Sequence, residues 1–371
     1  MNWQEVKSNY PAACDHVYLN TAACGLISSN TKNAVNSHFQ YYLELGSNAR
    51  DKWISQVEDT RSKAALLAGV AKENLLFVAN YTAAMNQIAA MWQHRYKKVL
   101  MLEGDFPSVV LPWKIHKYTC HFFKASEGEK ISLKTIESYL HKVKPDILAI
   151  SHVQYNTGFR IDLSELAALC KKYGTIFLVD ATQSYGAFPI EAKKNDVDVL
   201  ISSVYKWTTA GFGLGICYIN PELMENCYPN IAGNSSNGQE LFPKIDSEVA
   251  LKQAAFEIGH TNFPGIVSLN TALTDLFSIG IENIASRIVT LNQFLTSQLK
   301  EINETYLVTD FSEMNASGII SLKLPINLEK RLFDLKVITS YRNKGLRVSF
   351  HLYNDEKDLT TFTHLLQELS A

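Results

Sequence analysis

A lysine and an aspartate follow two neighbouring apolar segments, and both side chains could do chemistry. Lys206 comes after the apolar run 197–204 and before the glycines of 211–215, and Asp180 ends the apolar run 176–180. If these runs are adjacent parallel strands, both side chains lie at one edge of the sheet. A lysine amine can form a Schiff base with pyridoxal phosphate (PLP), and an aspartate can hold the pyridine nitrogen protonated. The pair therefore predicts a PLP site.

Each residue also has a simpler interpretation, and the neighbouring residues decide between the two. A lysine at a strand end is usually solvated, and an aspartate after a strand often caps the next helix. However, Gln183 can reach the phenolic oxygen of the cofactor ring, and Ser203 and Tyr205 carry hydroxyls that can bind its phosphate. Burial beside an aromatic system would also favour the neutral amine at Lys206. We therefore favour the cofactor site.

A helix start provides a second candidate for phosphate binding. The stretch 80–82 follows the apolar strand 75–79 and precedes a helix-forming segment, 83–92. Backbone N–H groups at a helix start bind phosphate. We expect Tyr81 and Thr82 to contact the phosphate, with Thr82 as the N-cap residue. A cap without a ligand is the simpler alternative.

The segments around these residues alternate between strand and helix patterns. Segment 162–174 has apolar residues at helical spacing, an acidic start, a basic end and a final glycine. It lies between apolar strands at 146–153 and 175–180, and further strands are expected at 97–102 and 213–219. This order predicts an α/β fold with a mostly parallel sheet that is covered by helices on both faces.

The pattern changes after residue 220. A loop-rich stretch (221–244) comes first, then a helical pattern (269–299), short strands (319–324 and 345–350) and a closing helix from 355. Blocks of helices and strands predict a smaller α+β domain. We expect a large PLP-binding domain over 15–260 and a small C-terminal domain over 261–371, with residues 1–14 packing on the small one.

Composition and charge narrow the class of protein. The chain has 371 residues, of which 46% are hydrophobic, so it can bury a sizeable core. Its 35 Lys and Arg against 37 Asp and Glu give a formal net charge of −2 without a basic block, which argues against nucleic acid as a partner. The apolar runs are too short for a membrane span, and the first residues do not resemble a signal peptide.

The cysteines argue against a metal site. The six of them stand at positions 14, 24, 120, 170, 217 and 227 and include no Cys-x-x-Cys pair. Such spacing does not suit zinc and favours reduced thiols. We therefore expect no metal and a cytoplasmic location.

Short motifs along the chain resemble the class V aminotransferase family. The matching segments are 18–23, 80–82, 105–108, 153–158, 205–207, 256–265 and 345–354, in the family's order. This branch of the fold-type I PLP enzymes includes cysteine desulfurases, kynureninases and isopenicillin N epimerases. The resemblance implies a large domain with a mostly parallel seven-stranded sheet, and a homodimer with shared active sites. In that dimer His260, where the family usually has threonine, or Thr261 would reach the neighbouring subunit's phosphate.

The same resemblance implies roles for individual residues. Phe106 would stack on the PLP ring, and Gln154 would contact the cofactor. Arg347 would bind the α-carboxylate of an amino-acid substrate through its guanidinium fork, with Arg342 as the reserve candidate. Asn20 and the nearby Ala23 would line the substrate pocket.

Two departures from the family bear on the reaction. Cysteine desulfurases carry a nucleophilic cysteine on a late loop, but the last cysteine here is Cys227, which argues against a persulfide-forming desulfurase. Cys24 falls near the expected pocket entrance, and a small buried thiol explains it better. Phe106 stands where desulfurases and many relatives have histidine. Because phenylalanine cannot transfer protons, Lys206 remains as the main acid and base.

The residues leave the outcome of catalysis open. Transamination and β-elimination by a C–S or C–Se lyase are our leading interpretations, and epimerase- or kynureninase-like chemistry is the alternative. A non-catalytic PLP-binding protein is an alternative of another class, and the joint presence of Lys206, Asp180 and Arg347 argues against it. We reject a dinucleotide-dependent oxidoreductase, because the glycines of 211–215 precede a strand instead of opening a helix.

Overall fold

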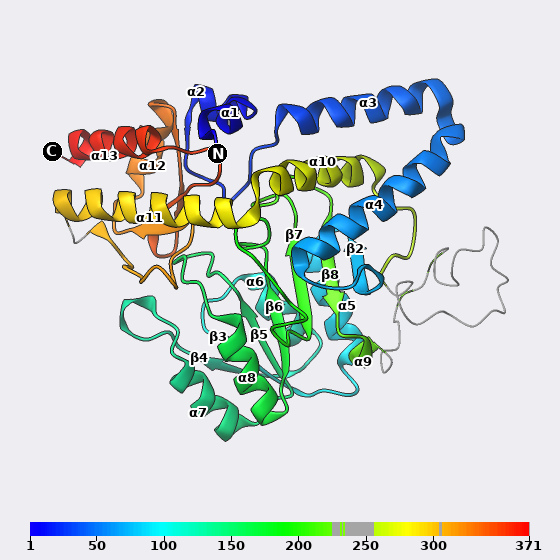
Figure 1. Cartoon of the computed structure of the whole chain (residues 1–371). Coiled ribbons are helices and arrows are strands. Elements are labelled where there is room, and N and C mark those ends of the chain that lie inside the picture. Colours follow the sequence, from blue (N-terminus) through cyan, green and yellow to red (C-terminus); the bar gives the residue numbers. More distant parts are fainter. Residues whose placement is uncertain (225–230, 232, 234–255, 304–305, 371) are drawn as a thin grey trace.

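A seven-stranded sheet forms the centre of the molecule (Figure 1). The computed structural model describes residues 1–224, 231, 233, 256–303 and 306–370. The strands are β2 (Leu75–Val78), β3 (Lys98–Leu102), β4 (Thr119–Phe123), β5 (Ile147–Ser151), β6 (Ile176–Asp180), β7 (Val199–Ser203) and β8 (Gly215–Ile219). They lie in the order β2-β8-β7-β6-β5-β3-β4, and every neighbouring pair is parallel except the two that β8 makes. The expected α/β fold is confirmed.

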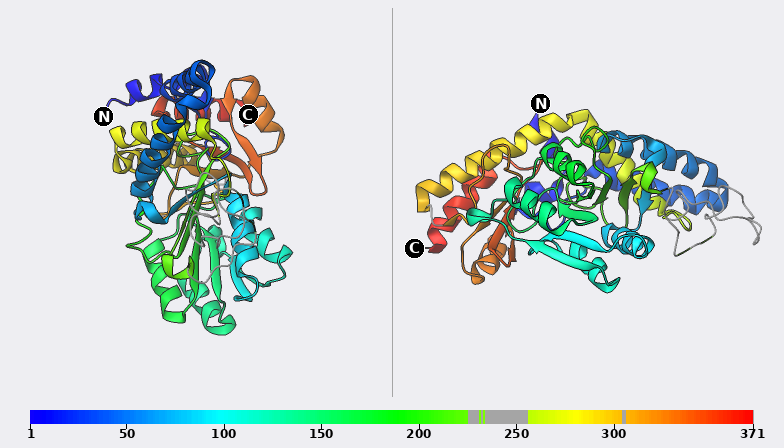
Figure 2. Two further views of the ribbon diagram at one scale, coloured as in Figure 1. Left: turned by 90° about the vertical axis from the view of Figure 1, so that its right-hand side faces the viewer. Right: turned by 90° about the horizontal axis from the view of Figure 1, so that it is seen from below.

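Helices cover both faces of this sheet, as the left view of Figure 2 shows. The covering helices are α4 (Arg50–Ala68), α5 (Tyr81–Trp92), α6 (Pro107–Ile115), α7 (Leu133–Val143) and α8 (Leu163–Tyr173). Side chains alternate between the faces along each strand. Val99 and Met101 of β3 share a buried cluster with α5 and α6, whereas Leu100 and Leu102 belong to the cluster of α4, α7 and α8. Strands buried on both faces explain the unbroken apolar runs of the sequence.

The sheet brings the carboxyl ends of three strands to one edge. Asp180 of β6 pairs in register with Ser151 of β5 and with Ile201 of β7. Lys206 follows β7 by three residues, and α5 begins shortly after β2. The chemistry-bearing residues of the sequence therefore meet at this edge, where ligands bind in open α/β sheets.

The C-terminal part forms a smaller antiparallel sheet with helices beside it. Its sheet has the order β11-β12-β9, with β9 (Ile319–Leu322), β11 (Ser340–Arg342) and β12 (Gly345–Ser349). The helices of this part are α11 (Ile281–Asn303), α12 (Asn327–Asp334) and α13 (Glu356–Ser370). A helix before them, α10 (Phe263–Ile279), packs against α4 and against the long α3 (Ser29–Leu45).

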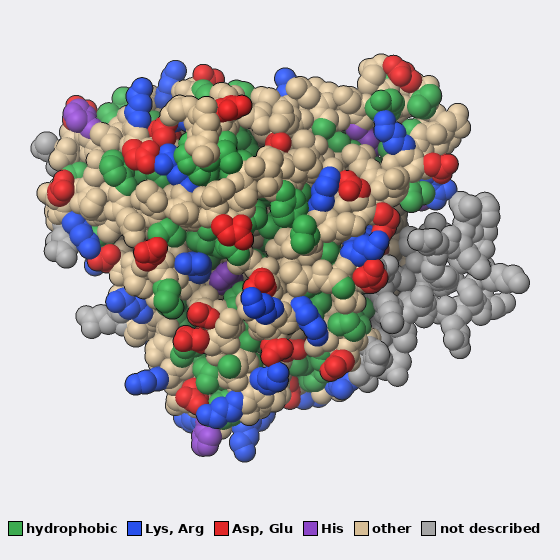
Figure 3. Space-filling view, in the orientation of Figure 1, with side chains coloured by type: hydrophobic (Ala, Val, Ile, Leu, Met, Phe, Trp, Pro, Cys, Tyr) green, Lys and Arg blue, Asp and Glu red, His purple; other side chains and the backbone are tan. Residues whose placement is uncertain are grey.

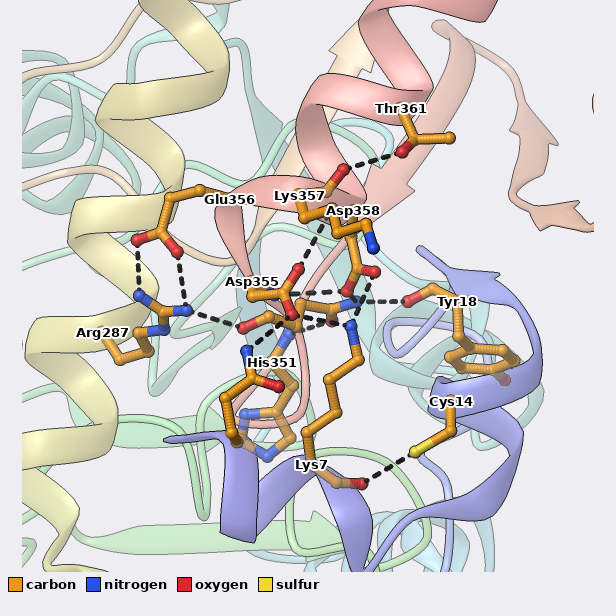
Figure 4. Close-up of polar contacts among 12 residues, drawn as sticks. Lys7, Cys14, Tyr18, Arg287, His351, Asp355, Glu356, Lys357, Asp358 and Thr361 are labelled. Atoms are coloured by element: carbon orange, nitrogen blue, oxygen red, sulfur yellow. Dashed lines mark hydrogen bonds and ion pairs between the residues drawn. The ribbon is translucent and has the colours of Figure 1, made fainter. Parts of the chain in front are cut away.

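The N-terminal segment joins the C-terminal part. Its elements are α1 (Trp3–Ser8), α2 (Pro11–Asp15) and β1 (Val17–Tyr18), and β1 pairs in parallel with β10 (Val337–Ile338). Lys7 of α1 contacts Asp355 Oδ2 at 2.9 Å and Asp358 Oδ1 at 2.8 Å (Figure 4). The pairing of β1 therefore crosses the predicted boundary at residue 15, and the domain limits stay a prediction.

Charges of both signs are interspersed on the face of the molecule that Figure 3 shows. In the part of the chain that the structure describes, no helix is long and apolar enough to cross a membrane. The same residues include no cluster of three or more His, Cys, Asp or Glu side chains arranged to hold a metal ion.

Candidate active site

A cavity of about 410 Å³ opens at the carboxyl edge of the large sheet, around Lys206. Its lining residues are Asn80, Tyr81, Thr82, Phe106, Ser151, Tyr155, Asp180, Thr182, Gln183, Ser203, Tyr205 and Lys206. These come from the ends of β5, β6 and β7, the start of α5 and the loop before α6. The structure thus brings together most of the residues that the sequence assigns to the cofactor.

Lys206 enters this cavity without a partner. Only 6% of its surface is exposed, and it has no hydrogen bond or ion pair with any described residue. Its Nζ lies 5.5 Å from the ring centroids of both Phe106 and Tyr205. Burial lowers the pKa of Lys206 to about 8. The negative charge of Asp180 opposes this shift, and the positive charge of Arg347 adds to it. The amine can therefore lose and regain a proton near neutral pH.

Asp180 provides a buried carboxylate at the same cavity. Its Oδ1 accepts a hydrogen bond from Thr182 N at 2.8 Å, and Thr182 Oγ1 in turn accepts one from Ser203 N at 3.2 Å. Burial raises the pKa of Asp180 to about 6, although the hydrogen bonds with Thr182 oppose this. At neutral pH the carboxylate is mostly ionised, so it can stabilise a proton on a nitrogen that faces it.

The start of α5 corrects one prediction. Asn80, not Thr82, is the N-cap residue, because its extended backbone allows Oδ1 to accept from Ala83 N at 2.9 Å. Thr82 lies inside the helix, and its Oγ1 shares a hydrogen bond of 2.9 Å with Ser108 Oγ. Thr82 still lines the cavity, so it stays a candidate for phosphate contact.

Tyr81 carries a second group without a partner. Its backbone N donates to Ser203 Oγ at 3.1 Å, but its buried hydroxyl has no hydrogen-bond partner among the described residues. Burial raises the pKa of Tyr81 well above its usual value, so the hydroxyl keeps its proton. An unpartnered amine, an unpartnered hydroxyl and a buried carboxylate around one cavity fit a polar ligand such as PLP.

Asp105 does not line the cavity but holds two residues that do, a role that the sequence did not predict. Its Oδ1 accepts from Ser151 Oγ at 2.6 Å and from Phe106 N at 2.7 Å, and its Oδ2 accepts from Ser151 N at 3.0 Å. These bonds tie the Phe106 loop to β5 and hold the ring at the cavity. The sequence signal that could have indicated this role is an aspartate soon after the end of β3, similar to Asp180 at the end of β6.

Gln154 contacts Asp105 and does not line the Lys206 cavity. Its Nε2 donates to Ser151 O at 3.1 Å and to Asp105 Oδ2 at 3.5 Å. It lines a neighbouring cavity of about 330 Å³, together with Asn156 and Lys344. Its expected contact with the cofactor stays a prediction.

Arg347 lies on β12 of the smaller sheet and is 1% exposed. Its Nη1 donates to Tyr155 O at 2.8 Å and its Nη2 to Ser340 Oγ at 3.2 Å, but its Nε has no partner among the described residues. Burial and then the charge of Arg342 lower the pKa of Arg347 to about 9. This guanidinium makes no ion pair with a described carboxylate, so it retains the capacity to bind one from a ligand.

The N-terminal segment packs on the backbone of Lys206. Gly25 N donates to Tyr205 O at 3.0 Å, and a Cβ on Gly25 would lie 1.8 Å from Lys206 O, so only glycine fits there. Asn20 Oδ1 is buried without a partner among the described residues, and Ala23 N donates to Asn20 O at 3.0 Å. Neither Asn20 nor Ala23 lines the Lys206 cavity.

His260 and Thr261 lie outside this cavity, just before α10. His260 is exposed and Thr261 is half-buried. Neither residue lines the site within one chain, and the expected contact with a neighbouring subunit's phosphate stays a prediction.

The comparisons with known proteins agree with this geometry. Residues 17–334 match the sequence model of the family "Aminotransferase class-V". A probable cysteine desulfurase of Pyrococcus abyssi is 24% identical, and the alignment covers 99% of this chain and 97% of the relative. The solved cysteine desulfurase of Thermococcus onnurineus has a TM-score of 0.90 at 22% identity, covering 99% and 97%.

A further solved structure is that of C-DES, a cystine C–S lyase in complex with cysteine persulfide. It has a TM-score of 0.88 at 20% identity and covers 97% of this chain and 99% of its own. At such identities these structures show the shared fold, while the family match rests on the sequence itself. The chain therefore belongs to the class V aminotransferase family of PLP-dependent enzymes, as its motifs predict.

Proposed function

We propose that this protein is a PLP-dependent C–S lyase, which eliminates sulfur from the β-carbon of an amino acid. The observation that carries the proposal is the Lys206 cavity, in which a partnerless amine and a buried carboxylate meet and no cysteine is among the described lining residues. A desulfurase retains sulfur on its own thiol, whereas a lyase releases it with the product. The similarity to the cystine lyase C-DES also supports this choice.

Several residues would hold PLP in the cavity. Lys206 would be the point of covalent attachment, Asp180 would face the pyridine nitrogen, and Phe106 would cover the ring. The remaining contacts would come from Tyr81, Thr82, Gln154, Gln183, Ser203 and Tyr205. When bound there, PLP supplies an electron-withdrawing ring that stabilises negative charge at the substrate α-carbon.

The chain's own groups account for the proton transfers and the orientation of the substrate. Arg347 would bind the α-carboxylate, with Asn20 and Ala23 near the substrate and Arg342 as the reserve. Lys206, with a pKa of about 8, would take the α-proton and could return it to the leaving sulfur. Phe106 cannot share this task because its side chain has no ionisable group.

Cystine is the first candidate substrate. In the overall reaction the Cβ–S bond breaks, the sulfur leaves with the bonding electrons as cysteine persulfide, and one water converts the remaining three-carbon fragment into pyruvate and ammonia. The closest alternative within the family is transamination, which would yield a keto acid and keep the carbon–sulfur bond intact.

A product analysis distinguishes these reactions. The holoenzyme is incubated with L-cystine and with a panel of other L-amino acids, and pyruvate, ammonia, persulfide, keto acids and D-amino acids are measured. The proposal predicts pyruvate and persulfide in equal amounts from cystine. A keto acid without sulfur release would make the protein an aminotransferase, and a D-amino acid would make it an epimerase.

Cys24 provides a test of the statement that no enzyme thiol takes part. Its Sγ donates to Gly25 O at 3.4 Å, and burial raises its pKa although Lys206 opposes this, so the thiol is a weak nucleophile. We expect Cys24→Ser to keep the wild-type rate, and the same for Cys227→Ser, whose position lies outside the described residues. A loss of activity in either variant would restore the desulfurase interpretation.

We further propose a homodimer in which His260 or Thr261 reaches the cavity of the neighbouring subunit. Their position on the surface, away from their own cavity, supports this. Light scattering should give the mass of a dimer, and a strict monomer would contradict the shared site.

A cytoplasmic location is part of the proposal, because the five described cysteines are all free thiols.

A further inference from the structure

The amide of Gln183 is held at both ends by groups with a fixed hydrogen-bond character. The indole Nε1 of Trp207 donates to Gln183 Oε1 at 2.6 Å, and Gln183 Nε2 donates to Ala22 O at 3.0 Å. An indole nitrogen can only donate and a backbone carbonyl can only accept, so both partners select the same orientation of the amide. The second N–H of Gln183 Nε2 has no partner among the described residues, and Gln183 lines the Lys206 cavity.

Trp207 is itself held in place. It is 1% exposed, and its carbonyl is 2.7 Å from Nε2 of His351, which must donate to it. The indole packs edge-on against the His351 ring at a centroid distance of 5.1 Å. Its six-membered ring also fills the space beside Gly318, where an added Cβ would lie 2.5 Å from Cη2. The indole N–H therefore points at Gln183 without freedom to turn away.

We propose that Trp207 is a positioning residue that makes Gln183 a hydrogen-bond donor, and not an acceptor, toward the Lys206 cavity. This inference rests on the proposed function, in which PLP occupies that cavity. A donor favours an ionised oxygen opposite it, so the phenolic oxygen of PLP would be held in its anionic form. Without the indole, Ala22 O alone selects this orientation, so the amide of Gln183 turns over more readily and presents its oxygen in a fraction of the molecules.

The test is a pH titration of the visible absorption of the holoenzyme, which reports protonation at the Lys206-bound cofactor and does not depend on turnover. Trp207→Phe removes the donor and keeps an aromatic ring. A Gln183 N–H that faces the cofactor stabilises its deprotonated form. Losing that orientation of the amide should therefore raise the spectral midpoint by about one pH unit. A midpoint equal to that of the wild type would overturn the inference.

Trp113→Phe is the matched control. Trp113 is fully buried, and its Nε1 has no hydrogen-bond partner among the described residues, so this variant loses an indole without losing a hydrogen bond. Its spectral midpoint should stay at the wild-type value. The same shift in both variants would mean that Trp207 acts through general packing, which would overturn the inference.

A double-mutant comparison shows whether Trp207 acts through Gln183. Gln183→Met removes the amide, and adding Trp207→Phe to it should then leave the midpoint unchanged. A second shift in that background would overturn the inference. If Trp207→Phe does not fold, Gln183→Glu takes its place, because a carboxylate offers no donor and should also raise the midpoint. An unchanged midpoint in Gln183→Glu would overturn the inference, and a wild type without a visible band would overturn the cofactor site itself.

Discussion

Two lysines of this protein, the half-buried Lys7 and the buried Lys206, have opposite surroundings. Lys7 of α1 pairs with Asp355 and Asp358, at the start of α13, at 2.9 and 2.8 Å (Figure 4). Lys206 lies at the edge of the large sheet, where no described residue pairs with it. Burial opposes the charge on Lys7, but its hydrogen bonds outweigh this and raise its pKa, whereas burial lowers the pKa of Lys206 to about 8.

The difference separates a structural contact from a functional one. The two carboxylates that bind Lys7 have further partners: Asp358 Oδ2 accepts from Asn354 Nδ2 at 3.1 Å, and Asp355 Oδ1 accepts from Asp358 N at 2.9 Å. Of the nearby Arg287, which holds Glu356, only Nε has no partner among the described residues. Around Lys206, the Tyr81 hydroxyl and Arg347 Nε have no partner among the described residues. Buried polar groups without partners are costly, so a cluster of them is expected where a ligand completes the set.

Replacing Lys206 should have the largest effect on activity. Lys206→Ala should reduce the rate of product formation by at least about 10³-fold, because the proton-transferring amine is gone. Its free energy of unfolding should not fall, since no partner is lost. Lys194→Ala is the control, because Lys194 is exposed and pairs only with Glu191 among the described residues. A destabilised Lys206→Ala protein with retained activity would contradict the assignment.

The pH dependence of cofactor uptake measures the surroundings of Lys206 directly. Only the neutral amine reacts, so uptake of PLP by the apo-protein should rise with pH and reach half its maximum at about pH 8. At neutral pH the neutral fraction exceeds that of an ordinary lysine on the order of 100-fold. Uptake is followed by visible absorbance. A midpoint near 10.5 would show that the cavity does not perturb the amine.

Arg347 should affect binding more than turnover. Arg347→Gln removes a charged donor for the substrate carboxylate, which should raise KM roughly 10- to 100-fold. The same change at Arg342 should have a smaller effect if Arg347 is the main ligand. Steady-state kinetics with cystine separates KM from kcat for both variants. A larger effect at Arg342 would exchange the two roles, and exposed Arg331 serves as the unaffected control.

The Lys7 pair should affect stability and not chemistry. Lys7→Met leaves two partly buried carboxylates without their cation, which should lower the free energy of unfolding by about 3 kcal/mol. The comparison is Lys124→Met, which breaks the exposed pair with Glu103 and should change stability little. Urea unfolding measures both variants. Equal effects would show that the Lys7 contacts contribute no more than a surface pair.

The sequence predicted the large sheet well because its strands are buried on both faces. The runs that became β5, β6 and β7 are short and apolar, and the capped helix α8 separates β5 from β6. The residues that follow these strands line the Lys206 cavity. The edge strand β4 was not predicted, since Thr119–Phe123 mixes polar and apolar residues on a partly exposed edge. The cap of α5 was misplaced because Asn80 and Thr82 are both good N-cap residues, and only the backbone geometry distinguishes them.

Contacts between distant parts of the chain could not be predicted from the sequence. Nothing near Lys7 indicates Asp355 and Asp358, and nothing near Trp207 shows that its indole reaches Gln183. Such pairs depend on how the N-terminal segment and the smaller sheet pack on the large one. The sequence therefore predicted which residues line the Lys206 cavity better than which residues hold them in place.

The most direct test of the account is to locate the cofactor on the chain. The holoenzyme is reduced with borohydride, digested, and searched by mass spectrometry for a lysine that carries the pyridoxyl phosphate group. We predict a yellow protein that loses its colour on reduction and retains the group on Lys206 alone. A colourless protein that takes up no PLP, or a label on another lysine, would contradict the proposed active site.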